Sequence, residues 1–205
     1  MGLGEHSLTH TSYACHLMYS VKAKAPKKSP FSYHDALTSG VSRRALQRLL
    51  ADGQIERIGR GVYRDATRDD HGEESFRNAT ALVGEPSAIC LLSALSHYGL
   101  TDLIPKRTWI MVPAPKRTTA AQVRLLRKRD PRWRIGITRQ SGYSITTVER
   151  TILDTLCSSD PGMDEGLSAL KKALRQRLTT PAKIAEVARQ LGVFNRLLPY
   201  LRAVS

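Results

Sequence analysis

Residues 42–64 read SRRALQRLLADGQIERIGRGVYR, and this stretch decides the fold of the N-terminal part of the chain. Ser42 is a suitable helix N-cap, because its hydroxyl can accept a hydrogen bond from an N–H group of the first turn. Each following residue turns about 100° around the helix axis. The apolar side chains then gather on one side: Ala45, Leu46, Leu49 and Leu50. The cationic and amide side chains gather on the other: Arg43, Arg44, Gln47 and Arg48. Because an apolar face must be buried, we expect a helix from Ser42 to Asp52 that presents its arginines to solvent.

A hairpin and a second helix are expected on either side of this helix. Two short runs rich in β-branched residues, 55–58 and 62–64, flank Gly59-Arg60-Gly61 and predict a β-hairpin with Arg60 at its tip. Upstream, residues 30–37 predict a short helix capped by Ser32, followed by a turn over 38–41. The order helix, turn, helix, hairpin is that of a winged helix-turn-helix, whose second helix enters the DNA major groove.

A basic helix face is more often a solvated surface than a binding surface. Here the basic face, the turn spacing and the glycine-bounded hairpin occur together, which favours DNA binding. The candidate DNA-binding residues are Ser42, Arg43, Arg44, Gln47, Arg48, Arg57, Arg60, Tyr63 and Arg64. Arginine can bond guanine and glutamine can bond adenine through two atoms each in the major groove. Which side chains contact bases and which contact phosphates stays open.

The whole chain is basic. Its 205 residues include 32 Lys and Arg against 18 Asp and Glu, a net charge of +14. This balance favours a polyanionic partner without separating DNA from RNA or a membrane surface. The three cysteines, Cys15, Cys90 and Cys157, form neither a metal motif nor a disulfide framework, so we expect a reducing cytoplasm. No apolar run approaches the roughly 18 residues of a membrane span.

Composition and pattern divide the chain into four segments and predict an α+β protein. We expect a basic, disordered arm over 1–29, a winged helix-turn-helix domain over 30–66, a polar linker over 67–75 and a mixed α/β domain with a helical C-terminal end over 76–205. Asp69, Asp70 and His71 in the linker suggest a metal site, but a solvated linker is the better interpretation because nothing nearby completes a coordination shell.

The second domain shows alternating helix and strand patterns. Residues 87–100 predict a buried helix ended by Gly99, in which His97 is a packed structural residue rather than a catalyst. The expected strands are 108–112, 134–138 and 143–145. A helix through Cys157 is expected to begin with Thr146 and Glu149 as a capping box, which counts against a catalytic pair of Glu149 and Asp154. Further helices are expected over the leucine stripe 167–178, after Thr180-Pro181 and over 194–201.

The largest charge surplus lies between Lys106 and Arg139. This window has eleven Lys and Arg against the single acid Asp130, a net charge of +10, and Trp109 and Trp133 are interleaved. A possible second basic surface consists of Lys106, Arg107, Lys116, Arg117, Arg127, Lys128 and Arg129. It can contact flanking DNA or a partner. The alternative is a solvated face with both tryptophans in the core, and the sequence favours neither.

The sequence resembles AbiEi-type antitoxins of bacterial toxin–antitoxin pairs. The likeness rests on GVSRRALQRLLADGQIERIGRGVYR for the N-terminal domain, and on SAICLLSALSHYGLTD, RTWIMVPAPKR and ITTVERTILDTL, in that order, for the C-terminal domain. It covers roughly residues 30–160. The resemblance implies a repressor that binds inverted repeats in its own promoter and neutralises a cognate nucleotidyltransferase toxin, directly or functionally. It places the recognition helix at Ser42–Asp52 and the wing at Ile58–Tyr63.

Two other function classes are the alternatives. A winged-helix-targeted nuclease needs carboxylates that converge on a metal with an activator, and the sequence shows no such constellation. An RNA-binding protein would prefer structured RNA over duplex DNA. We therefore expect no enzymatic activity, no cofactor, no bound metal and no membrane partner, with double-stranded DNA and the toxin as partners.

Overall fold

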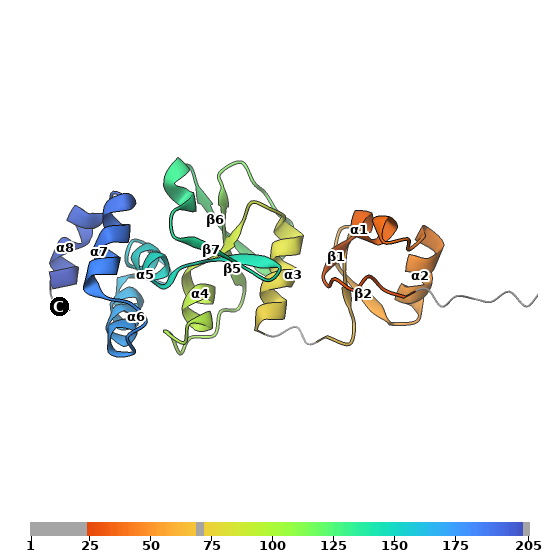
Figure 1. Ribbon diagram of the computed structural model, residues 1–205, viewed down its shortest axis with the longest axis horizontal. Helices are drawn as coiled ribbons and strands as arrows, with labels where there is room; N and C mark the ends of the chain where they lie inside the picture. Colours follow the sequence, from red (N-terminus) through yellow and green to blue (C-terminus); the bar gives the residue numbers. More distant parts are fainter. Residues whose placement is uncertain (1–23, 69–71, 203–205) are drawn as a thin grey trace, which may run out of the picture.

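The computed structural model describes residues 24–68 and 72–202, which form an α+β protein with a three-stranded and a five-stranded sheet (Figure 1). We call residues 24–68 the N-terminal module and residues 72–202 the second module. Most of the predicted arm and the Asp69-Asp70-His71 group lie outside the described residues.

The N-terminal module has the predicted order of elements. It contains β1 (Phe31–Ser32), α1 (Tyr33–Thr38), α2 (Arg43–Ala51), β2 (Ile55–Gly59) and β3 (Val62–Asp65). The strands form an antiparallel sheet in the order β1-β3-β2. Both predicted caps are confirmed. Ser32 Oγ accepts from Asp35 N at 3.0 Å while Asp35 Oδ2 accepts from Ser32 N at 2.8 Å, and Ser42 Oγ accepts from Ala45 N at 3.2 Å.

A small apolar core holds these elements together. It comprises Phe31, Ala36, Val41, Leu46, Leu49, Ile55 and Tyr63. Residues 24–29 belong to this module, because Ala25 packs against the core and Ser29 Oγ accepts a hydrogen bond from Asp65 N at 3.1 Å. The expectation of a disordered arm is therefore wrong for 24–29.

The second module is built on a mixed sheet in the order β6-β5-β4-β8-β7. Its strands are β4 (Ala88–Ile89), β5 (Thr108–Pro113), β6 (Val123–Lys128), β7 (Ile137–Gln140) and β8 (Tyr143–Thr146). The pairs β5–β6 and β4–β8 are parallel, and β4–β5 and β7–β8 are antiparallel. Its helices are α3 (Glu73–Val83), α4 (Leu91–His97), α5 (Val148–Leu156), α6 (Met163–Arg175), α7 (Pro181–Gln190) and α8 (Phe194–Arg202), with a 3-10 turn η1 at Pro131–Arg134.

Two apolar clusters account for most of this module. One joins α3 to the sheet through Phe76, Ala79, Ile110 and Tyr143. The other joins α4 to the C-terminal helices α5, α6, α7 and α8, with Leu153, Leu170 and Ile184 at its centre. The predicted helical C-terminal end is thus present, and Thr180 caps α7 with Pro181 at its first position, as predicted.

Several local expectations are wrong. Residues 134–138 do not form one strand, because Arg134 ends η1 and β7 begins at Ile137. Residues 87–100 do not form one helix, because Ala88–Ile89 form the central strand β4 before α4 begins. The strand β6 was not predicted. The N-cap of α5 is Thr147, whose side chain accepts from Arg150 N, whereas Thr146 is the last residue of β8 and Glu149 accepts a hydrogen bond from Thr179 Oγ1 at 2.7 Å.

The two modules touch along the wing side of the N-terminal module. Gly59 lies directly against the Leu82 side chain of α3, and Gln122 Nε2 donates to the carbonyl of Ile58 at 3.4 Å. The helix α2 lies at the end of the N-terminal module that faces away from the second module (Figure 1). The second module therefore leaves the outer face of α2 uncovered.

Candidate nucleic-acid interface

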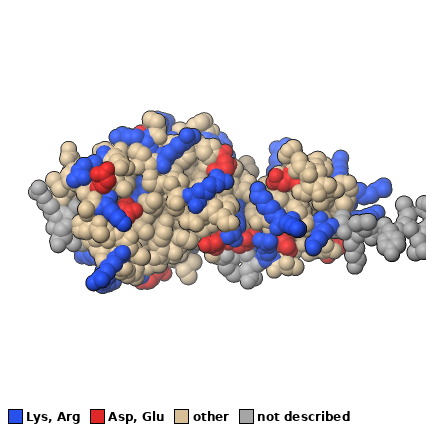
Figure 2. Space-filling view, in the orientation of Figure 1, with Lys and Arg blue, Asp and Glu red and all other residues tan. Residues whose placement is uncertain are grey.

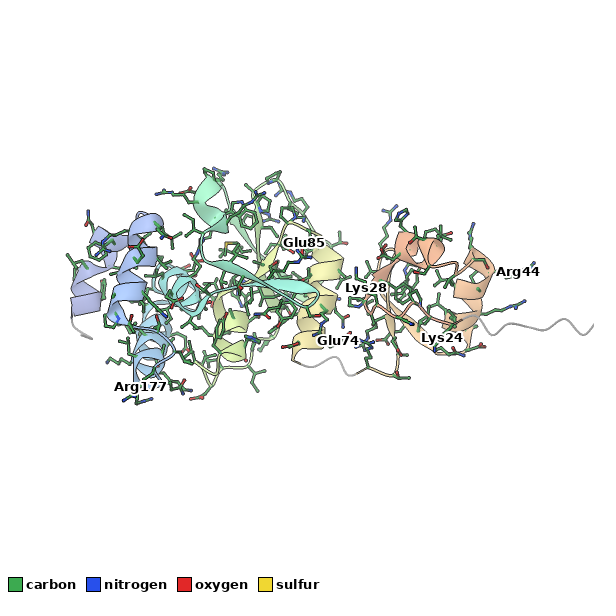
Figure 3. The ribbon with its side chains drawn as sticks, in the orientation of Figure 1. Lys24, Lys28, Arg44, Glu74, Glu85 and Arg177 are labelled. Atoms are coloured by element: carbon green, nitrogen blue, oxygen red, sulfur yellow. The ribbon has the colours of Figure 1, made fainter. Side chains whose placement is uncertain are left out.

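The outer face of α2 is cationic and open to solvent. Arg43, Arg44, Gln47 and Arg48 are all exposed, whereas Leu46 and Leu49 are 3% and 2% exposed. Figure 3 shows Arg44 at the far end of the molecule, pointing away from it. The predicted orientation, leucines inward and guanidinium groups outward, is confirmed.

The position of these arginines is unfavourable for the isolated helix. Arg43 and Arg44 occupy the first turn of α2, which has no acid. A helix N-terminus carries a partial positive charge, so a cation there destabilises the helix by roughly 0.3–1 kcal/mol. The first turns of α3 and α6 have the favourable arrangement, with two acids each. An anion bound at the N-terminus of α2 would offset this unfavourable charge.

The arginines of α2 and of the hairpin tip are not used within the protein. Among the described residues, Arg43, Arg44, Arg48 and Arg60 form no ion pair or side-chain hydrogen bond. Some of the other exposed arginines have acidic partners, such as Arg132 with Asp130 at 2.6 Å, and others, such as Arg117 and Arg129, have none in the described part of the chain. These four guanidinium groups therefore keep their donors available for a ligand.

The hairpin turn is shaped by its glycines. Gly61 has φ +70°, a conformation that other residues rarely adopt, and the register shifts between Arg57 and Gly59. Arg57 is exposed and its Nε donates to the carbonyl of Gly59 at 3.1 Å, so its position is tied to the turn. Arg60 is exposed at the tip.

Tyr63 and Arg64 have structural roles that the sequence did not indicate. Tyr63 is 9% exposed and stacks on Phe31 with ring centroids 5.8 Å apart, so it belongs to the core rather than to an open surface. The Arg64 side chain is 14% exposed and its Nε pairs with Glu56 across the hairpin. Both residues hold the sheet together, and neither presents its side chain to a duplex.

The possible second basic surface is divided in two. Lys106 and Arg107 precede β5, whereas Lys116 and Arg117 follow it, and a six-residue strand spans about 20 Å. Because β6 runs parallel to β5, its last residues and Arg129 lie at the same end as Lys116 and Arg117. Figure 2 likewise shows basic side chains spread over both modules rather than gathered in one patch.

Two lysines of this set serve the structure. Lys116 Nζ donates to the carbonyls of Gly84 and Pro86, and its partial burial lowers the pKa of its ammonium group. Lys128 pairs with Asp154 at 3.0 Å. The exposed cations at this end of the sheet are Arg117, Arg127 and Arg129.

The tryptophans of the basic window are core residues. Trp109 and Trp133 are 7% and 9% exposed and pack in one cluster with Cys90, Leu91 and Met111. The Arg124 guanidinium lies 3.9 Å from the centroid of the Trp109 ring. The burial of both tryptophans is confirmed, and the role of the basic side chains around them stays a prediction.

Asp154 forms ion pairs with two cations and does not pair with Glu149. Besides Lys128 it accepts from Arg150 Nε at 2.7 Å, and Arg150 is 2% exposed. Glu149 bonds to Thr179 instead. In the described part of the chain, no three His, Cys, Asp or Glu side chains come together as a metal site, and no helix is long and apolar enough to cross a membrane.

Three cations of the N-terminal module lie outside the set of candidate DNA-binding residues predicted from the sequence. Lys24, Lys27 and Lys28 are exposed on a segment that packs on the module rather than trailing from it. Figure 3 shows Lys24 toward the α2 end and Lys28 toward the second module. The density of lysines beside two prolines indicated a disordered segment. The apolar residues Ala25 and Phe31, which contact the core, were the signal against that interpretation.

Comparison with known proteins finds one family match, in the N-terminal module. Residues 24–64 match the family model of the AbiEi antitoxin, a transcriptional regulator. The match spans both helices and the hairpin, and it confirms the resemblance seen in the sequence of this segment. No curated protein matches the chain.

Proposed function

We propose that this protein is the antitoxin of a bacterial toxin–antitoxin pair that acts in the cytoplasm as a repressor of its own promoter. The observation that supports this most is the open cationic face of α2 on a module that matches a regulator family. The order of elements supports a winged helix-turn-helix, with α1 and α2 as its helix pair and β2–β3 as its wing.

In the proposed complex, α2 enters the major groove with its N-terminal turn leading. Arg43, Arg44 and Arg48 supply donors for guanine O6 and N7 or for phosphates, and Gln47 can pair with adenine N6 and N7. The Ser42 cap holds the first turn so that the arginines project from a rigid helix.

The wing supplies contacts to the DNA that do not discriminate between base sequences. Because Ile58 and Gly59 contact the second module, the wing contacts are assigned to its exposed side chains. Arg60 at the tip reaches phosphate or the minor groove, and Arg57 contacts the backbone beside it. Such contacts set the register of the protein on the duplex, whereas α2 selects the sequence. An operator with inverted repeats would place a second copy of the chain on the other half-site.

The second module is proposed to neutralise the cognate toxin, an enzyme of the nucleotidyltransferase type. Support comes from the resemblance of residues 87–156 to the C-terminal domain of AbiEi-type antitoxins. DNA binding can be separated from neutralisation by experiment, because the α2 face and the second module lie at opposite ends of the molecule (Figure 1).

Binding of the full chain to its own promoter tests the proposal. We expect the Arg44→Ala/Arg48→Ala double variant to lose at least tenfold in affinity, because each base contact contributes about 1–3 kcal/mol. Repression of a promoter–reporter fusion should be lost in parallel. Alanine is a strong helix former, so the fold should be unaffected.

The matched control removes the same charge elsewhere. Lys171→Ala/Arg175→Ala takes two exposed cations from α6, in the second module, and should leave promoter affinity within about twofold. Equal affinity of the α2 double variant and the wild type would rule out docking through α2. Preferential binding of structured RNA, or metal-dependent cleavage of plasmid or tRNA, would instead indicate one of the alternative functions.

A further inference from the structure

A cavity of about 730 Å³ lies between the two modules. Its N-terminal wall includes Lys27, Lys28 and Asp35, and its other wall includes Arg77, Thr80 and Arg139. Ligand sites typically have volumes of roughly 300–1,000 Å³ and often form at domain interfaces. The cavity therefore has the size and the location of a small-molecule site.

Cationic side chains outnumber carboxylates in the lining of the cavity. Five cations line it: Lys27, Lys28, Arg68, Arg77 and Arg139. Asp35 and Glu85 are the carboxylates of the lining. Asp65, Glu73 and Glu74, just outside it, pair with Arg68 and Arg77, so Lys27 and Lys28 are the lining cations without an ion pair among the described residues. Asp35 is engaged by the N–H group of Ser32, a bond that lowers the pKa of its carboxyl group. Glu85 lies 3.7 Å from Arg139 and accepts from Ser87 N.

The cations differ in how far they are engaged. Arg77 is held by Glu73, Glu74 and the carbonyl of Ser141 at 2.7–3.0 Å. Lys27 and Lys28 are exposed and form no ion pair with any residue in the ranges 24–68 and 72–202. Figure 3 shows Lys28 on the side of the N-terminal module that faces Glu85 and Glu74. These lysines can supply donors to an anion without breaking an existing bond.

A buried hydroxyl provides an independent indication of a ligand. Thr80, which lines the cavity, is 5% exposed, and its Oγ1 has no hydrogen-bond partner among the described residues. A buried polar group without a partner is costly, and such groups in native structures usually bond to a water, an ion or a ligand. Val62 and Ala81 add apolar surface beside it.

We propose that this cavity binds a phosphate-bearing small molecule of nucleotide size. Lys27, Lys28 and Arg139 contact the phosphates, Thr80 donates its hydroxyl to the ligand, and Val62 and Ala81 pack against its apolar part. Charge-assisted bonds to phosphate are the strongest that these side chains can form. The duplex proposed for α2 is not the occupant, because α2 lies at the opposite end of the N-terminal module.

A ligand held by both walls would tie the N-terminal module to α3 and to the turn between β7 and β8. It would therefore favour one relative orientation of the modules and change promoter affinity accordingly. This regulatory consequence rests on the proposed repressor function, whereas binding of the ligand does not.

Calorimetric titration of the full chain with ATP, pyrophosphate, inorganic phosphate and adenosine tests the site. We expect ATP to bind, pyrophosphate and phosphate to bind more weakly, and adenosine to bind least. The Lys28→Gln/Arg139→Gln variant should weaken ATP binding about tenfold or more, since it removes two charge-assisted contacts. Thr80→Val should also weaken ATP binding, with an unchanged unfolding midpoint as the check on its fold.

The control variant Lys24→Gln/Lys171→Gln removes two exposed cations that do not line the cavity and should bind ATP like the wild type. Absence of ATP binding at millimolar concentration would overturn the proposal, as would equal ATP affinity of the Lys28→Gln/Arg139→Gln variant and the wild type. Displacement of ATP by duplex DNA of random sequence would also overturn it. If the protein binds ATP but does not bind its promoter, with or without ATP, the proposed repressor function is wrong and the proposed ligand site is not affected.

Discussion

At the scale of single residues, internal bonds identify the cations that stabilise the fold. Arg64, Lys116 and Arg150 are bonded within the fold, whereas Arg44 and Arg48 project from α2 with no partner in the described part of the chain. Exposure alone does not make this distinction, because most cations of so basic a chain are exposed. The distinction predicts opposite effects of substitution, on stability for the first group and on binding for the second.

Tyr98 gives a residue-scale prediction about stability and pH. Burial, with smaller contributions from Glu149 and Tyr143, raises the pKa of Tyr98 to about 12, and its hydroxyl donates to the carbonyl of Thr146 at 2.8 Å. Because the pKa is higher in the folded state, this contribution to stability is complete below about pH 10 and is lost as the pH rises toward 12. Tyr98→Phe should lower the free energy of unfolding by about 1 kcal/mol at pH 8.

The deficit of the Tyr98→Phe variant should shrink at pH 11.5, where the wild type has lost most of the advantage. Urea unfolding at both pH values measures the two differences. Tyr200→Phe, at an exposed position, is the control and should match the wild type at both. A deficit that stays constant from pH 8 to pH 11.5 would contradict the assigned burial of the Tyr98 hydroxyl.

At the scale of elements, close helix packing and short strands determine the second module. The helices α5 and α6 approach each other at Gly166, where an added Cβ would lie 2.8 Å from the backbone nitrogen of Leu156. The central strand β4 has only two residues, yet it joins the two halves of the sheet by pairing with β5 and β8.

Gly166→Ala tests the approach of α5 and α6. In an open helix this change stabilises by about 1 kcal/mol, but here the contact with backbone should outweigh the gain and lower the free energy of unfolding by about 1–3 kcal/mol. Ser168→Ala, on the exposed face of α6, should be neutral or slightly stabilising. Urea denaturation measures both, and a Gly166→Ala variant at least as stable as the wild type would show that the helices are farther apart.

The cationic end of β5 and β6 gives a second element-scale prediction. If Arg117, Arg127 and Arg129 contact flanking DNA, their triple substitution by glutamine should weaken promoter binding and lower the slope of log affinity against log salt by about one for each lost phosphate contact. Fluorescence anisotropy at several salt concentrations measures the slope. An unchanged slope would assign these arginines to solvent or to a protein partner.

The sequence predicted the N-terminal module well because its signals are local. Ser32 and Ser42 cap helices whose periodicity is clear over two turns, and glycines mark the hairpin. The same patterns could not show that Tyr63 faces the core. Successive side chains of a strand point to opposite faces of the sheet, and the pattern alone did not fix which face of β3 is buried. Nor could they show that Glu56 engages Arg64 across the hairpin.

Prediction was poorer in the second module for physical reasons. All residues from 88 to 95 except Leu92 are buried, so their nearly continuous apolar run does not distinguish strand from helix. In β6, the sequence VRLLRK has charges where a strand pattern expects apolar residues, because this strand lies at the edge of the sheet. The cavity between the modules joins residues far apart in the chain, which no local pattern indicates.

At the scale of the whole molecule, the two modules place the proposed activities at opposite ends. The α2 face points away from the second module, and the wing lies against α3 (Figure 1). A chain built in this way can lose one activity and keep the other, provided that both modules stay folded.

Separation of the two activities is the whole-molecule prediction. In cells that carry the toxin, the Arg44→Ala/Arg48→Ala variant expressed from a foreign promoter should still prevent growth arrest, although it no longer represses its own promoter. Growth and reporter activity measured in the same strains give both results. Loss of protection by this variant, at wild-type protein levels, would show that neutralisation depends on DNA binding.

The most direct test of the central claim, that α2 contacts promoter bases, is the ratio of promoter affinity to affinity for a scrambled duplex of equal length. Arg44→Ala or Arg48→Ala should lower this ratio by about fivefold to a hundredfold, whereas Arg57→Ala should weaken both affinities alike and leave the ratio unchanged. An unchanged ratio in both α2 variants would contradict the claim.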